Sequence, residues 1–252
     1  MPIAYLRGLT GSQRTPIANR HLGLALAFVA GAVNAGGFLA IGYYTSHMTG
    51  IVSAMADHLA LAYYPWVIGG FAAMLCFVAG AACCALLVNW GRRNGWQSAF
   101  ALPLAVEAAL LLVFGLLGSR LANFAWIFVP STVALLCFVM GLQNAIITKI
   151  SHAEIRTTHV TGIVTDLGIE FGKWVYWNRG EEGARVLANR PRMLLLGGLL
   201  FMFFLGGVCG ALGFKIYGYA TTIPLAVILL LFALVPIGDD VVAHWKIRHR
   251  PR

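Results

Sequence analysis

The sequence predicts an all-α integral membrane protein whose six transmembrane helices form two inverted three-helix repeats. Of its 252 residues, 60% are hydrophobic and only 11% are charged, a balance far more apolar than that of soluble domains. An eleven-residue phrase occurs twice, as SHMTGIVSAMA at 46–56 and as THVTGIVTDLG at 158–168. The composition indicates a membrane protein, and the doubled phrase indicates an internal duplication.

Six apolar stretches are long enough to be transmembrane helices, because about 20 residues cross a hydrocarbon core of roughly 30 Å. They cover residues 22–43, 66–88, 99–118, 124–147, 193–214 and 220–237. None contains Lys or Arg, and Glu107 is their only carboxylate. If the N-terminus is cytoplasmic, only Arg120 and Lys215 of the 18 Lys and Arg residues lie outside. The positive-inside rule therefore predicts a multi-pass protein with both termini in the cytoplasm.

The duplication extends well beyond the doubled phrase. FVAGAVNA at 28–35 matches FVMGLQNA at 138–145, and LPLAV at 102–106 matches IPLAV at 223–227. Between these matches, Gly70, Phe77 and Gly80 align with Gly197, Phe204 and Gly207, which lie 127 positions later in the chain. We call this separation the offset of the alignment. Because three spans per unit is an odd number, the second unit must begin on the opposite side of the membrane from the first.

These matches divide the chain into four predicted parts. A basic cytoplasmic N-terminus at 1–21 precedes the first three-helix repeat at 22–122. The second repeat at 123–238 precedes a basic cytoplasmic C-terminus at 239–252. We interpret the basic termini as contacts to anionic lipid headgroups rather than to nucleic acid.

The His-x-Thr-Gly phrases predict a short re-entrant or interfacial helix in each repeat. Each phrase leads a segment too polar and too short for a full crossing. We expect Thr49 and Thr161 to cap these helices, and Gly50 and Gly162 to let the backbone bend. If the segments fold inward, their N-termini present partial positive charge, which suits an anion or a polar solute. The alternative is that both helices lie flat at the interface.

Other polar residues are candidates for the same site. Asn34 and Asn144 occupy matching positions in apolar helices, where an amide is either structural glue or a solute contact. His47 and His159 head the two phrases and are candidates for solute contact, with an interfacial role as the alternative. In the second phrase, Thr165 and Asp166 are further candidates.

Two charged residues stand apart from the phrases. Arg156 precedes the second phrase and has no basic counterpart before the first. It is a candidate for contact with the solute or for an ion pair, and the alternative is an anchor on the cytoplasmic side under the positive-inside rule. Glu107 lies within an apolar span, where a carboxyl group is expensive to ionise. It is a candidate proton-handling group, and a neutral hydrogen-bonding acid is the alternative.

The inverted repeats and the polar residues of the two phrases favour a transporter or channel-like protein for a small polar or anionic solute. The sequence contains no Walker, Rossmann, GxSxG or HExxH pattern, so we expect no enzyme activity and no cofactor. The five cysteines lie within the predicted spans without metal-type spacing, so we expect no metal site. The lipid bilayer is the expected partner, and the sequence leaves open whether the protein forms a homo-oligomer. A non-transporting membrane scaffold or a lipid-handling protein is the alternative function.

Two signature regions resemble those of the YoaK-like bacterial membrane proteins, a family of unknown function. The regions are GAVNAGGFLAIGYYTSHMTGIV and GLQNAIITKISHAEIRTTHVTGIVTDLGIE, and the resemblance covers residues 22–237. It implies a bacterial inner-membrane protein with about six spans. Many relatives have Asp where this chain has Asn34, and often Asn where it has Ile51. These departures make the second phrase the better candidate for solute contact.

Overall fold

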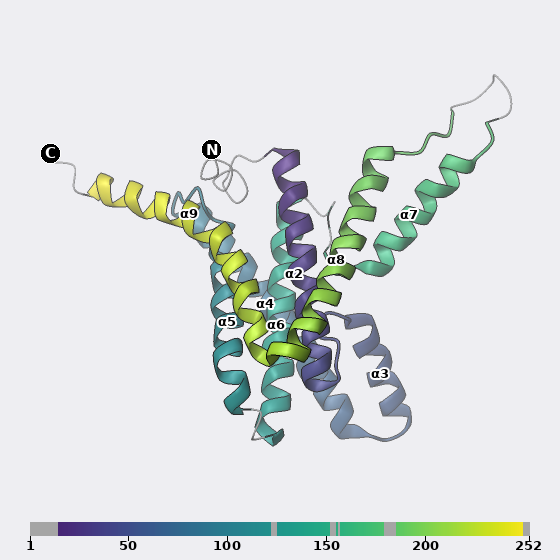
Figure 1. Cartoon of the computed structure of the whole chain (residues 1–252), viewed down its shortest axis with the longest axis vertical. Helices are drawn as coiled ribbons and strands as arrows, with labels where there is room; N and C mark the ends of the chain where they lie inside the picture. The colour runs from purple at the N-terminus through teal and green to yellow at the C-terminus, as the bar shows by residue number, and fades with distance from the viewer. Residues whose placement is uncertain (1–14, 122–124, 152–154, 156, 179–184, 249–252) are drawn as a thin grey trace.

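The computed structural model describes residues 15–121, 125–151, 155, 157–178 and 185–248, and this part of the chain is helical, with turns and links between helices. The elements in chain order are α2 (Pro16–Ile41), α3 (Met48–Ala60), α4 (Tyr64–Arg93), α5 (Ala101–Leu121), α6 (Ala125–Ile150), α7 (Val160–Val175), α8 (Arg190–Tyr217), the 3₁₀ turn η1 (Gly218–Thr221) and α9 (Thr222–Arg248). The long helices form a bundle, and α3 and α7 project from it towards opposite ends (Figure 1).

Each of the six predicted apolar stretches falls largely on a long helix, and local sequence explains where some of these helices begin and end. Thr15 caps α2 by accepting a hydrogen bond from the Ala18 N–H at 3.2 Å, and Pro16 follows as its first residue. Asn189 caps α8 in the same way through the Arg192 N–H. Gly42 ends α2 in the left-handed conformation with φ of 70°.

Length and composition mark four described stretches as candidate membrane spans. They are Pro16–Ile41, Tyr64–Arg93, Phe128–Ile150 and Arg190–Lys246. The last stretch is 57 residues long because α8, η1 and α9 follow one another without interruption. The structure is therefore that of an all-helical, multi-pass membrane protein.

Three pairs of long helices account for most of the packing: α2 lies on α8, α4 on α6, and α5 on α9. Glycines allow the closest approach in the first two pairs. A Cβ added at Gly31 would collide with the Phe203 carbonyl of α8, and one added at Gly206 would collide with the Phe28 carbonyl of α2.

The contact of α4 with α6 repeats that of α8 with α2. A Cβ at Gly141 would collide with the Phe77 carbonyl, and one at Gly80 with the Phe138 carbonyl. These contacts make Phe77 equivalent to Phe203 and Gly80 equivalent to Gly206, an offset of 126. The sequence alignment at 127 was therefore wrong by one residue, because the paired glycines Gly206 and Gly207 fit either register.

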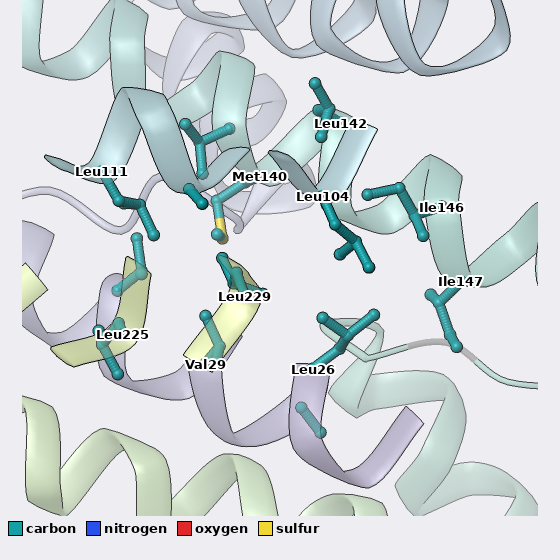
Figure 2. Close-up of a cluster of buried hydrophobic side chains, with 14 of the residues drawn as sticks. Leu26, Val29, Leu104, Leu111, Met140, Leu142, Ile146, Ile147, Leu225 and Leu229 are labelled. Atoms are coloured by element: carbon teal, nitrogen blue, oxygen red, sulfur yellow. The ribbon is translucent and has the colours of Figure 1, made fainter. Parts of the chain in front are cut away.

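The interior is apolar and is built mainly by α2, α5, α6 and α9. Figure 2 shows side chains of these four helices meeting, among them Leu26, Leu104, Met140 and Leu229, all fully buried. By contrast, α4 and α8 expose large apolar side chains such as Phe71 and Phe204. Such outward apolar faces suit helices that contact lipid.

The end of α9 is anchored by a buried carboxylate. Asp240 accepts hydrogen bonds from the Ser98 N–H at 2.7 Å and from the Ser98 hydroxyl at 2.6 Å, just before α5 begins. The helix continues to Arg248, so much of the segment predicted as a basic C-terminal part is helical. Asp240 therefore belongs to the packed bundle.

Candidate functional site

The first phrase is tied to α2 by the side chain of Asn34. The Asn34 Oδ1 accepts a hydrogen bond from the Ser46 N–H at 3.2 Å and another from the Ser46 hydroxyl at 2.9 Å. Asn34 lies seven residues before the last residue of α2, which corresponds to about 10 Å along a helix axis. The chain therefore turns back along α2 before α3 begins.

The second phrase is tied to α6 in the same manner. The Thr158 hydroxyl donates to Asn144 Oδ1 at 2.7 Å, while Asn144 Nδ2 donates to the Met140 carbonyl at 2.8 Å. Asn144 lies six residues before Ile150, the last residue of α6, or about 9 Å along the axis. Asn34 with Ser46 and Asn144 with Thr158 therefore form two matching hydrogen-bonded links.

The histidines occupy the N-cap positions of the two short helices. His47 precedes α3 and His159 precedes α7, and neither side chain makes a capping hydrogen bond. The prediction that Thr49 and Thr161 cap these helices was wrong, because both lie second within the helix. Both threonines and both histidines are exposed.

The glycine of each phrase makes room for the histidine ring. A Cβ at Gly50 would collide with the ring of His47, and a Cβ at Gly162 would collide with that of His159. Each ring therefore folds over the first turn of its own helix. The helix start is left without a side-chain acceptor, so its first N–H groups are available to another acceptor.

The start of α3 lies at about mid-height of the bundle. Ile51, in its first turn, is buried with Ala73 of α4 and Cys137 of α6, and Cys137 is halfway along α6. In Figure 1 the starts of α3 and α7 both lie near the middle of the molecule, and the helices diverge from there. This arrangement favours the re-entrant over the interfacial interpretation.

Sequence reasoning missed the hydroxyl residues that precede each histidine. Besides Ser46 and Thr158, the preceding residues Thr45 and Thr157 are fully buried, and their hydroxyls have no hydrogen-bond partner among the described residues. The alignment at an offset of 112 already paired these positions, and it could have identified them. Gly37 of α2 accommodates Thr45, whose hydroxyl lies 3.7 Å from the position of a Cβ there.

The remaining candidates of the second phrase lie apart from this arrangement. The Arg192 guanidinium donates to Asp166 at 2.9 Å, so Asp166 pairs with the start of α8. The Thr165 hydroxyl donates to the Thr161 carbonyl of its own helix at 2.9 Å and is exposed. Arg156 lies outside the described residues.

Glu107 lies on α5 and is fully buried. The described residues contain no group of three or more His, Cys, Asp or Glu side chains that could hold a metal ion. Two cavities, of about 540 Å³ and 340 Å³, are lined almost entirely by apolar residues. Neither is lined by a predicted site residue.

The long apolar helices and the two hydrogen-bonded links define a multi-pass α-helical membrane protein with paired helix starts inside its bundle. The family described as "Protein of unknown function (DUF1275)" matches residues 22–235, and the chain belongs to this family. The match confirms the resemblance to the YoaK-like proteins.

A curated relative supports the same assignment. The chain is 30% identical to the "UPF0700 transmembrane protein YoaK" of Bacillus subtilis (strain 168) over 145 residues, which are 56% of this chain and 62% of the relative. The match therefore spans less than two thirds of that relative's length. No solved structure matches the chain.

Proposed function

We propose that this protein is a transporter or channel of the bacterial inner membrane for a small polar or anionic solute. In this proposal six helices, α2, α4, α5, α6, α8 and α9, cross the membrane as two inverted repeats. The solute passes between the starts of α3 and α7. The observation that carries the proposal is the matching pair of links, Asn34 with Ser46 and Asn144 with Thr158.

The exchange of contacts between the two halves supports the inverted repeat. If α2 corresponds to α6 and α4 to α8, then the pairing of α2 with α8 becomes that of α6 with α4, as observed. The pairing of α3 with α4 likewise becomes that of α7 with α8. Inverted repeats related by an axis in the membrane plane are a recurrent architecture of transporters, with the binding site near the midplane.

The helix starts supply the chemistry for a polar or anionic solute. Non-helical backbone persists at membrane depth only when it is buried in protein or lines a water-filled cavity. Residues 42–47, 155 and 157–159 are such backbone if the bundle is embedded as proposed. The N–H groups and partial positive charge at the starts of α3 and α7 favour an acceptor or an anion.

A flux measurement in liposomes tests this function. Purified protein is reconstituted in liposomes of phosphatidylethanolamine and phosphatidylglycerol. Light scattering follows the recovery of liposome volume after addition of glycerol, urea, or the potassium salt of chloride, nitrate or formate. Valinomycin is added with the salts so that potassium can follow the anion. We expect at least one solute to equilibrate faster than in protein-free liposomes. Ser46→Ala and Thr158→Val should slow that flux at least several-fold.

Matched variants separate the site from general damage. Ser53→Ala removes an exposed hydroxyl on α3, and Thr148→Val removes a hydroxyl that bonds only within α6. Both should leave flux unchanged. Equal rates for every solute with and without protein would favour the scaffold alternative, in which the links stabilise the fold only.

A lipid-handling role is the second candidate, and the apolar cavity of about 540 Å³ favours it. This cavity is bounded by α2, α8 and α9, and Gly210 and Gly213 hollow its wall. An acyl chain is the kind of ligand that fits such a lining. Changed leaflet distribution of a fluorescent phospholipid in the same liposomes, without solute flux, would support this candidate.

A further inference from the structure

Glu107 is the most costly side chain in the interior. It is fully buried on α5, and both of its carboxyl oxygens lack a hydrogen-bond partner among the described residues. A carboxylate in that position would lose its hydration without gaining a donor or a bonded cation. The neutral acid, with one O–H donor, is the form that such a site stabilises.

A complementary acceptor lies on the neighbouring helix. Gln143 of α6 is fully buried and donates from Nε2 to the Leu26 carbonyl at 3.4 Å, while its Oε1 has no partner among the described residues. A protonated carboxyl group needs an acceptor, and Gln143 Oε1 needs a donor. The α5 helix packs on α6, so Glu107 and Gln143 lie on neighbouring helices, and each has an oxygen without a partner among the described residues.

Few other titratable groups surround this site. From α4, the thiol of Cys84 lies near enough to both Glu107 and Lys149 for electrostatic interaction, and Cys83 adjoins it. The α9 stretch 225–233 contains no titratable residue. From η1, Tyr219 contacts Phe114, two turns further along α5. Lys149, near the end of α6, is within electrostatic reach of the Cys84 thiol.

The second half of the molecule has no counterpart to this cluster. The positions equivalent to Glu107, Gln143 and Lys149 are Ile228, Val33 and Leu39, and the position equivalent to Cys84 is Gly210. Ile228 and Gly210 line the apolar cavity of about 540 Å³. The closest helix pairs repeat in the two halves, but this polar cluster is present in one half only.

We propose that Glu107 is a proton-binding site that couples proton movement to solute movement. In the described conformation one carboxyl oxygen carries the proton, and neither oxygen has a hydrogen-bond partner among the described residues. A shift of α5 against α6 opens the site to water, the O–H bond breaks, and the proton leaves to water. The coupling rests on the proposed transport function, whereas the bound proton does not.

Infrared spectroscopy of the reconstituted protein tests the bound proton without any solute. We expect the carbonyl band of a protonated carboxylic acid at neutral pH, and we expect Glu107→Gln to remove it. Asp240→Asn, at a buried carboxylate with two donors, should leave the band in place. If Glu107→Gln folds poorly, Glu107→Asp replaces it as the test variant. We expect Glu107→Asp to shift the carbonyl band rather than remove it.

Flux in the same liposomes tests the coupling. A solute found to move should equilibrate at least several-fold faster down an imposed pH gradient, and Glu107→Gln should abolish this dependence. An absent band, or a band that survives Glu107→Gln, overturns the proton site even if the solute moves. Flux that ignores the pH gradient while the band is present overturns the coupling. Absence of flux with the band present overturns the transport function and the coupling, and leaves the proton site standing.

Discussion

The Thr158 hydroxyl lies 2.7 Å from the side-chain oxygen of Asn144, and this bond ties the start of α7 to a point about 9 Å back from the end of α6. Ser46 and Asn34 make the same connection between α3 and α2. Burying an amide oxygen in an apolar helix costs free energy unless the oxygen accepts a hydrogen bond. Each hydroxyl supplies that hydrogen bond and, by doing so, also positions the short helix that follows it. Each pair of residues therefore has a structural role in positioning a helix.

Removing the Thr158 hydroxyl should lower stability measurably. Thr158→Val leaves Asn144 Oδ1 without its donor, and we expect a loss of about 1–3 kcal/mol in the free energy of unfolding in detergent. Thr158→Ser restores the hydroxyl and should recover most of that loss. Thr148→Val, which loses only a bond within α6, should change stability little. Equal unfolding midpoints for Thr158→Val and the unchanged protein would contradict the bond.

The glycines at the helix crossings should not tolerate even a methyl group. In Gly31→Ala and Gly141→Ala the new Cβ meets a backbone carbonyl, of Phe203 or Phe77, which cannot turn away as a side chain could. We expect each to lose about 1–3 kcal/mol or more, since overpacking forces the backbone apart.

Gly197→Ala is the matched control, because a Cβ there meets no atom within 4 Å. It should be neutral or slightly stabilising, since Ala favours helix. Thermal unfolding in detergent measures all three variants. A Gly141→Ala protein as stable as Gly197→Ala would show that α4 and α6 are farther apart than described.

The hairpin of α7 and α8 should loosen in acid. The hydrogen bond from Lys173, followed by that from the Asn189 N–H, lowers the pKa of Glu170 below its usual value. A group with a lowered pKa in the folded chain stabilises the fold above its unfolded pKa, and this contribution is lost as pH falls through the folded value.

We therefore expect hydrogen exchange in the last turn of α7 to accelerate below about pH 4, the ordinary range of a glutamate. Glu170→Gln should exchange faster at neutral pH and show no further acid step. Asp57→Asn, at an exposed residue of α3, is the control and should behave like the unchanged protein. An acid step of the same size in Glu170→Gln would assign it to other groups.

The sequence was sufficient to locate the helices because apolar length and turn residues depend on local chemistry. The ranges 22–43 and 124–147 fall largely on α2 and α6, and Gly42 ends α2 as its backbone freedom requires. The matching of Asn34 with Asn144 also followed from the alignment. These features require no knowledge of which helices touch.

The remainder depends on contacts between distant segments. Asp240 looked like part of a basic tail, and only its bond to Ser98 brings it into the bundle. Asp166 looked like a solute ligand, and its partner Arg192 is 26 residues away. Ser46 was visible in the doubled phrase, but its bond to Asn34 could not be predicted, because nothing in a sequence shows that a serine faces an asparagine.

The proposed topology makes a prediction about access from the two sides of the membrane. Arg93 at the end of α4 and Asn178 after α7 should lie on one side, whereas Ala62 after α3 and Tyr217 at the end of α8 should lie on the other. All four side chains are exposed.

Labelling of single cysteines tests this topology. One cysteine is placed at each of these positions in a chain whose five native cysteines are replaced by Ala or Ser. A membrane-impermeant maleimide should label the first two positions from one side of the membrane and the other two from the opposite side. Intact cells and inverted vesicles should give opposite labelling patterns, and detergent should make all four sites reactive. Labelling of Arg93→Cys and Asn178→Cys from opposite sides would contradict the six-span arrangement, and with it the inversion of the second repeat.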